Sequence, residues 1–301
     1  MQTNNKNSND NNAQAETHLR ENELVLACID GSSVSEAVCD YSSWIAKKSD
    51  TPLKLLHTIE HKHNPATSDL TGAIGLGSQQ ELLNELTELE QSRGKLLIKK
   101  GQLMLDAAKE RVVKAGIESP RIFQRHGRLS ESLIDLEDKT GLIVMGIRGE
   151  EHEQSQKGIG TQLETVIRSL HRPILVVTGE FSEPKKFMLA YDGSSACKKA
   201  LAMVAESSLC KDIPCHIVHV GDNAESLLAE AAKVLQQVGI ETVTSQLTGK
   251  ADQALCQYQA DNNIDLMVMG AFSHNRFRDF LLGSFTSKML AATNRPLLLL
   301  R

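Results

Sequence analysis

Several patterns that identify common classes of protein are missing from this chain of 301 residues. No apolar run approaches the length that spans a bilayer, and the N-terminus lacks the basic and apolar regions of a signal peptide. The six cysteines include no C-x-x-C pair, so we expect reduced, mostly buried thiols and a cytoplasmic location. The net charge of −5 argues against nucleic acid or an anionic membrane as the main partner.

The motifs of common catalytic and metal sites are also missing. There is no Gly-Lys-Ser/Thr of a P-loop, no dinucleotide-binding glycine fingerprint and no nucleophile elbow. His61 and His63 have no acidic or cysteine pair at ligand spacing, which favours a solvated loop over a metal site. The sequence therefore indicates no catalytic residue and no metal ligand, and at most a weak ATPase.

The composition that is present fits globular domains with a polar tail. Hydrophobic residues make up 41% and charged residues 24%, and the length leaves room for two domains. Residues 1–21 are mostly Asn, Ser, Asp, Gln and Glu. Such a segment buries too little apolar surface to offset its ordering entropy, so we expect a disordered tail.

An internal repeat determines the domain organisation. Five segments recur in the same order, namely 26–33 and 189–195, 56–58 and 218–220, 127–128 and 249–250, 142–146 and 266–270, and 172–177 and 295–300. An ordered set of this kind indicates one domain present twice. We place the copies at residues 22–180 and 185–301, with a linker at 182–185.

Each copy alternates short apolar runs with helical periods. In the first copy the runs at 24–29, 53–59, 122–124, 142–145 and 174–177 predict strands. The apolar spacing from Val34 to Ile45 predicts a helix, with Ser33 and Glu36 as a capping box at its start. This alternation predicts two tandem α/β domains, each a doubly wound, Rossmann-like parallel sheet. Ligands of such sheets bind beyond the carboxyl ends of the strands.

The last strand of each copy, at 174–177 and 297–300, is apolar throughout. Exposed edge strands of this kind are aggregation hazards. We therefore expect the two strands to pair within one chain, giving a pseudo-two-fold arrangement, an intramolecular pseudo-dimer. A further homodimer through residues 60–115 is left open.

The first copy carries an insertion at about residues 60–95. Its leucines predict one or two amphipathic helices, with Gly94 and Gly101 as breaks. Two interpretations are open. The helices either pack on the sheet or form a lid or partner surface.

Polar and glycine residues gather at the predicted ligand edge. Asp30 and Asp192 each follow a first strand, where a carboxylate can accept from a ribose hydroxyl or hold a cation, although Asp-Gly-Ser-Ser is also turn and N-cap chemistry. In the second copy a strand ends in Met-Gly at Gly270. Ser273 follows after two residues, and Gly283-Ser284 follows after nine more. Glycines and a helix N-terminus let backbone N–H groups approach phosphate oxygens.

This ordered set of motifs resembles the universal stress protein family in its tandem two-domain form. The family pattern is Gly, two residues, Gly, nine residues, then Gly-Ser or Gly-Thr. The second copy departs from it at Ser273, and the first copy has ten residues between Gly149 and Gly160. The resemblance implies a fold of the adenine-nucleotide α-hydrolase type and a stress-response protein. It also implies ATP or another adenine nucleotide in some members, with or without Mg²⁺.

The resemblance also implies which residues would hold the nucleotide. The Asp would meet ribose or metal, the residue at 58 or 220 would meet adenine, and the glycines with the following hydroxyls would line the phosphates. In the first copy these are Asp30, Thr58, Met145, Gly146, Gly149, Gly160 and Thr161. In the second copy they are Asp192, Val220, Met269, Gly270, Ser273, Gly283, Ser284 and Phe285.

Charge between the glycines favours the second copy as the nucleotide site. That segment carries Arg276 and Arg278, whereas the first copy has Glu150, Glu151 and Glu153 there. Arginines suit a triphosphate and carboxylates repel it. An alternative stays open, namely a scaffold protein, or one binding a small molecule other than a nucleotide, with degenerate sites.

Overall fold

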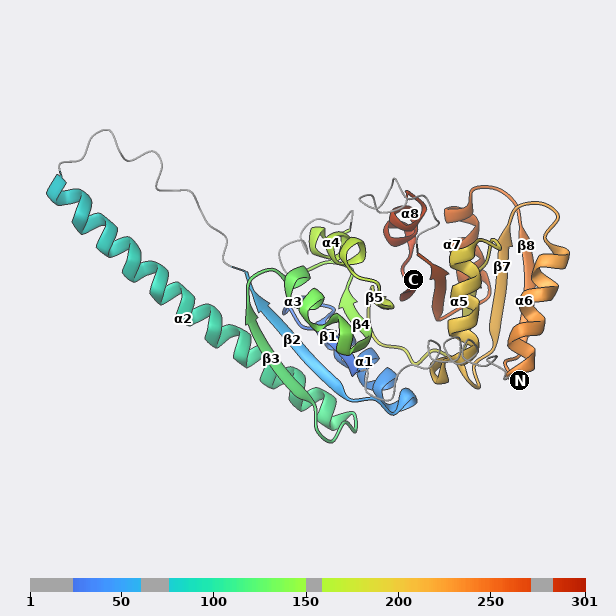
Figure 1. Ribbon diagram of the computed structural model, residues 1–301, viewed down its shortest axis with the longest axis horizontal. Coiled ribbons are helices and arrows are strands. Elements are labelled where there is room, and N and C mark those ends of the chain that lie inside the picture. The colour runs from blue at the N-terminus through green and yellow to red at the C-terminus, as the bar shows by residue number, and fades with distance from the viewer. Residues whose placement is uncertain (1–23, 61–75, 150–158, 272–283) are drawn as a thin grey trace, which may run out of the picture.

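The computed structural model describes residues 24–60, 76–149, 159–271 and 284–301 (Figure 1). The predicted tail at 1–21 lies outside these ranges, and so do the segments 150–158 and 272–283 between the site glycines. Within the described ranges, no helix combines the length and hydropathy needed to cross a membrane.

The two halves have matching element orders. The first half contains β1 (Leu24–Cys28), α1 (Ser35–Ser49), β2 (Leu53–Ile59), α2 (Leu76–Lys114), β3 (Arg121–His126), α3 (Leu129–Leu136), β4 (Thr140–Gly146), α4 (Thr161–Ser169) and β5 (Ile174–Val177). The second half contains β6 (Phe187–Ala190), α5 (Ser195–Glu206), β7 (Cys215–Val220), α6 (Glu225–Gln237), β8 (Thr242–Leu247), α7 (Ala251–Asp261), β9 (Leu266–Gly270), α8 (Ser284–Ala292) and β10 (Leu297–Leu300). All five strands predicted for the first half are confirmed.

The strands form one sheet in the order β3-β2-β1-β4-β5-β10-β9-β6-β7-β8. The pairs within each half are parallel. At the centre β10 pairs with β5 in antiparallel register, with Leu298 opposite Leu175. The expected pairing of the two apolar edge strands is therefore confirmed. Counted from either edge of the sheet, equivalent strands of the two halves follow one another in the same order, as a pseudo-two-fold relation requires.

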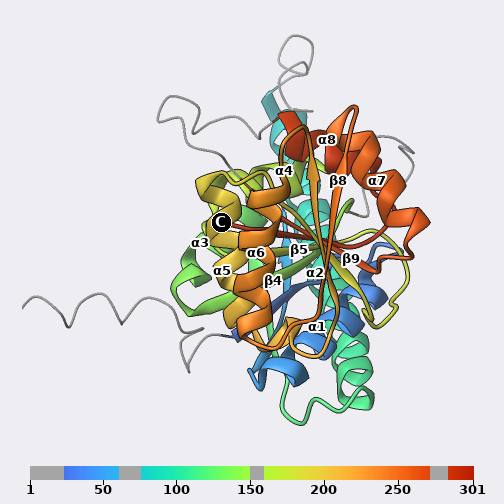
Figure 2. The ribbon, with the colours of Figure 1, turned by 90° about the vertical axis from the view of Figure 1, so that its right-hand side faces the viewer.

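Helices cover both faces of the sheet (Figures 1 and 2). One buried core lies between the sheet and α1, α2, α5 and α6, and the other between the sheet and α3, α4, α7 and α8. Alternate residues of β5 and β10 enter opposite cores, since Leu175 and Leu298 lie in the first, and Val176 and Leu297 in the second. Both cores therefore continue from one half into the other.

The start of α1 differs from the predicted capping box. The helix begins at Ser35 with Val34 as its N-cap residue and without a side-chain cap hydrogen bond. The Asp30 carboxylate organises this turn instead, because its Oδ1 accepts from Ser32 N at 3.0 Å and from Ser35 Oγ at 2.9 Å. Local turn chemistry displaces the cap by one residue.

The described part of the insertion belongs to a single helix, so the prediction that Gly94 and Gly101 break it was wrong. α2 runs without interruption over 39 residues. Gly101 is buried where α2 crosses the sheet, and a Cβ there would lie 2.6 Å from His57 Cδ2. Glycine is thus needed for close approach rather than for a turn. Figure 1 shows the first part of α2 extending beyond the edge of the sheet at β3.

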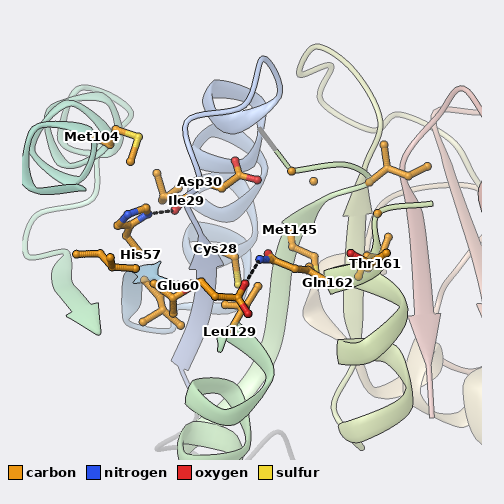
Figure 3. A pocket seen from close by; sticks show the side chains of 18 of the residues that line it. Cys28, Ile29, Asp30, His57, Glu60, Met104, Leu129, Met145, Thr161 and Gln162 are labelled. Carbon is orange, nitrogen blue, oxygen red and sulfur yellow. Dashed lines mark hydrogen bonds between the residues drawn. The ribbon is translucent and has the colours of Figure 1, made fainter. Parts of the chain in front are cut away.

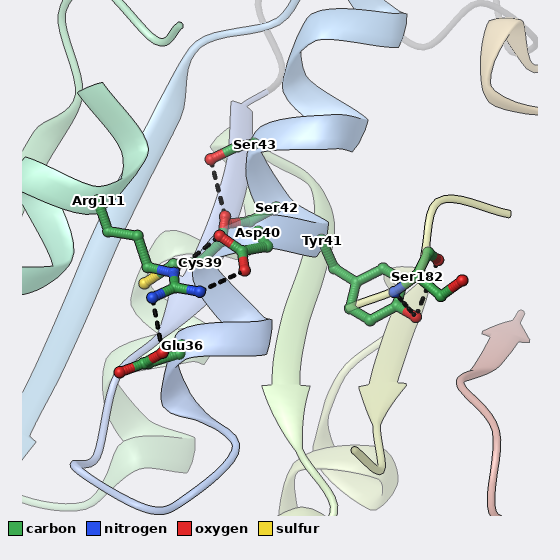
Figure 4. Close-up of polar contacts among 8 residues, drawn as sticks. All are labelled: Glu36, Cys39, Asp40, Tyr41, Ser42, Ser43, Arg111 and Ser182. Carbon is green, nitrogen blue, oxygen red and sulfur yellow. Dashed lines mark hydrogen bonds and ion pairs between the residues drawn. The ribbon is translucent and has the colours of Figure 1, made fainter. Parts of the chain in front are cut away.

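Two sets of polar contacts fix the helices next to the linker (Figure 4). Arg111 of α2 donates to both carboxylate oxygens of Asp40 at 2.8 and 2.7 Å and to Glu36 at 2.6 Å. In the linker, the Ser182 N–H donates to the Tyr41 hydroxyl at 3.3 Å, while Phe181 packs edge-on against the Tyr41 ring at 4.8 Å. The C-terminal half of α2 and the linker are both held on α1.

Candidate functional site

A cavity of about 410 Å³ opens at the carboxyl ends of β1, β2 and β4. The chain leaves β1 toward β2 on one side and later returns to β4 on the other, so this is the point where strand order reverses. The volume lies within the range of small-molecule sites. Seven lining residues are those that the resemblance implies for the first copy, namely Asp30, Thr58, Met145, Gly146, Gly149, Gly160 and Thr161.

The two carboxylate oxygens of Asp30 have different surroundings. Its Oδ1 is occupied by Ser32 and Ser35, which confirms the turn interpretation of this residue. A Cβ added at Gly149 would lie 3.2 Å from Asp30 Oδ2. The second oxygen therefore borders the space that Gly149 leaves open, where a hydroxyl or cation can reach it.

The other two glycines let the backbone pack closely around the pocket. A Cβ at Gly146 would lie 2.6 Å from Val34 Cγ2, and one at Gly160 would lie 3.2 Å from Ile147 O. Gly160 N also donates to Ile147 O at 3.1 Å. These contacts bring the end of β4 next to the start of α4.

The N-terminus of α4 faces the pocket. Gly160 is the N-cap residue and makes no side-chain cap hydrogen bond, and Thr161 and Gln162 of the first turn line the cavity. The first N–H groups of a helix have no intrahelical acceptor and carry partial positive charge. This end of the pocket is therefore suited to an anion.

Two polar lining residues, His57 and Glu60, were not predicted (Figure 3). His57 Nδ1–H donates to Ile29 O at 2.7 Å, and Glu60 accepts from Gln162 Nε2 at 3.2 Å. The repeat contains a signal for the histidine, because His219 Nδ1–H makes the equivalent contact with Tyr191 O at 2.9 Å. Glu60 lies beyond the matched segments and has no such signal.

α2 supplies a further wall that the repeat could not predict. Leu97, Lys100 and Met104 line the cavity from this helix. The counterpart of α2 in the second half is α6, which has 13 residues against the 39 of α2. The part of α2 that follows the predicted insertion therefore contributes both to the packing of the sheet and to the wall of the site.

Cys28 lies at the base of the pocket and is not a nucleophile. Burial, followed by the nearby Asp30 carboxylate, raises the pKa of its thiol to about 12. A thiol with that pKa holds its proton at neutral pH. Among the described residues, no group of three His, Cys, Asp or Glu side chains is arranged to hold a metal ion.

The second-half residues are placed only in part. Asp192, Val220, Met269 and Gly270 lie at the corresponding strand ends, and Ser284 and Phe285 begin α8. Ser273 and Gly283 lie outside the described residues. The described residues therefore do not test the preference for the second half.

Asp192 repeats the turn chemistry of the first half. It accepts from Ser194 N at 2.8 Å, and Ser194 caps α5 by accepting from Cys197 N at 3.3 Å. Burial raises the pKa of Asp192, but hydrogen bonds from Ser194 and Cys197 outweigh burial and hold that pKa below its ordinary value. Gly270 allows close packing here, since a Cβ would lie 2.8 Å from the Ala196 carbonyl carbon.

Comparison with known proteins agrees with this architecture. The model of the universal stress protein family matches residues 21–178 and 222–301. The universal stress protein Slr1230 of Synechocystis sp. is 38% identical over 284 residues, which cover 92% of this chain and 99% of that protein. A crystal structure of a universal stress protein from Archaeoglobus fulgidus has a TM-score of 0.68 at 19% identity and covers 93% of this chain and 99% of its own. With its fold, its repeated strand-end motifs and these matches, the chain belongs to the universal stress protein family.

Proposed function

We propose that this chain binds an adenine nucleotide in the first-half pocket, rather than in the second half that the charges between the glycines favour, and acts through a change of shape or of partner. The observation that carries the proposal is the pocket itself, which combines a helix N-terminus, three glycines and a carboxylate at the point where strand order reverses. These features suit a ligand with phosphate at one end and hydroxyl groups near its centre.

The residues present fit each part of a nucleotide. Thr161 and the N–H groups at the start of α4 would hold phosphate, and Asp30 would accept from ribose hydroxyls or share Mg²⁺ with the phosphates. The other end, near Thr58, is bordered by Leu97 and Met104, which provide apolar surface for a base.

The test is isothermal titration calorimetry with ATP, ADP and AMP, with and without Mg²⁺. We expect binding to the wild type and its loss in Gly160→Asp, because a carboxylate there would occupy and repel the phosphate position. Gly283→Asp is the matched variant in the second half, and we expect it to retain binding.

Two results would reverse parts of this proposal. Loss of binding in Gly283→Asp alone would assign the nucleotide to the second half. Absence of binding in the wild type would favour the alternative, a scaffold or a protein for another small molecule. Native mass spectrometry of the purified chain would then identify any ligand retained from the cell.

A further inference from the structure

The exposed side of α2 carries a row of leucines with a seven-residue period. Leu82, Leu89, Leu96 and Leu103 form this leucine stripe, and the last three are 66%, 67% and 62% exposed. Seven residues are close to two helical turns, so the four side chains follow one line along the helix. A period of seven is the pattern of helices that pair with helices.

The leucine stripe lies on the side of α2 that faces away from the sheet. The buried residues of α2, namely Gly101, Leu105, Ala108 and Val112, contact the sheet and α1 from the opposite side of the helix. Gln124 Nε2 donates to Ile98 O at 3.0 Å, and Arg111 is held by Asp40 and Glu36. The helix is thus fixed with its leucines outward.

Charge along the same part of the helix changes sign near its middle. From residue 82 to 92 the charged residues are Glu85, Glu88 and Glu90, and from 93 to 100 all four are Arg or Lys. Glu85, Glu88, Glu90, Arg93, Lys95 and Lys99 are exposed. Suppose that a second α2 lies antiparallel to the first and that the two helices cross near residues 92–94. The acidic segment of each helix then lies beside the basic segment of the other.

We propose that the projecting part of α2 pairs antiparallel with α2 of a second copy of this chain, forming a two-fold homodimer. A second copy fits this surface because an isologous contact needs a self-complementary patch, and the reversal of charge about the midpoint supplies one. A parallel pair would instead set acid against acid and base against base. Helices that project without packing are marginally stable in water, so the pairing also stabilises this part of α2.

The first test is the mass in solution, measured by light scattering and analytical ultracentrifugation. We expect the wild type to have twice the 33.0 kDa of one chain at micromolar concentration. Leu89→Lys combined with Leu96→Lys is expected to weaken the dimer by at least about tenfold. Val113→Lys, at an exposed apolar residue of α2 outside the leucine stripe, is the matched control and should remain dimeric.

The second test addresses orientation. Glu85→Cys and Lys99→Cys proteins, mixed under mild oxidation, should cross-link to each other far more than either does to itself. Reversing the acids alone (Glu85→Lys, Glu88→Lys, Glu90→Lys) should give a monomer. Reversing Arg93, Lys95 and Lys99 to Glu in the same chain should restore the dimer.

Each contrary result overturns the proposal. A monomeric wild type at tens of micromolar would do so, and so would a dimer that the paired leucine substitutions leave intact. Self-linking of the Glu85→Cys protein would replace the antiparallel pair by a parallel one. Circular dichroism of each variant separates a loss of pairing from a loss of folding.

Discussion

At the scale of the residue, Glu60 adds a negative charge to the pocket lining beside α4. Its carboxylate accepts from Gln162, the second residue of the helix whose N-terminus favours an anion. The same contact joins the end of β2 to the start of α4. A negative charge next to a phosphate position selects against ligands with several phosphates.

Replacing Glu60 with Gln should therefore tighten binding of ATP more than that of AMP, by about three- to tenfold at low salt. Calorimetry at low and high ionic strength measures the difference, which should shrink as salt rises. Glu118→Gln, at an exposed carboxylate outside the pocket, is the control and should change neither affinity. An equal gain in affinity for ATP and for AMP would show that Glu60 does not face the phosphates.

His216 makes folding stability depend on pH. Its Nδ1 lies 2.8 Å from the Tyr258 hydroxyl, which lies 2.8 Å from Ser245 Oγ. Burial, with a smaller contribution from Lys186, lowers the pKa of His216 from its ordinary 6.5. The unfolded chain then takes up a proton more readily than the folded one, so this contribution to stability is present above pH 6.5 and is lost as pH falls below it.

Urea unfolding of the wild type and of His216→Gln, at pH values on both sides of 6.5, tests this dependence. We expect the free energy of unfolding to fall at the acidic pH in the wild type and to fall less in the variant. If the free energy of unfolding fell as much in the variant as in the wild type, the pH dependence would belong to groups other than His216.

At the scale of the element, Gly94 and Gly101 of α2 should respond to substitution by Ala with changes in stability of opposite sign. Nothing lies within 4 Å of a Cβ added at Gly94, so Gly94→Ala should stabilise the chain by about 0.5–1 kcal/mol through helix propensity. At Gly101 the Cβ would lie 2.2 Å from Gln124 Nε2 and 2.6 Å from His57 Cδ2, both held by hydrogen bonds.

Gly101→Ala should therefore destabilise the chain by about 1–3 kcal/mol. It should also weaken ligand binding, because His57 lines the pocket. Thermal unfolding of both variants, followed by calorimetry with ligand, separates the two effects. Stabilisation by Gly101→Ala would mean that α2 crosses the sheet less closely.

The elements show which features of the fold can be predicted from sequence. Apolar runs such as 53–59 and 174–177 identify strands because parallel strands are buried on both faces. Gly101 misleads because propensity disfavours glycine within a helix, while the close contact with His57 requires it there. Lys100 and Met104 could not be assigned to the site, since they lie on a helix outside the short segments that match between the two copies.

At the scale of the whole molecule, the central β5–β10 pair makes the two halves one cooperative unit. Both cores pass through this pair, with Leu175 and Leu298 in one and Val176 and Leu297 in the other. We expect differential scanning calorimetry to show a single transition, and Val176→Asp to destabilise both halves together. Two separable transitions would indicate halves that fold independently.

The length of α2 has a mechanical consequence. From its first residue to Gly101 the helix measures about 37 Å, at 1.5 Å per residue. Met104, close to Gly101, lines the pocket, so the helix can act as a lever whose fulcrum lies beside the cavity. A tilt of about 5° at the fulcrum displaces the far end by about 3 Å. A small tilt of α2 at the cavity, too small to alter the sheet, would thus become a larger displacement at the far end of the helix.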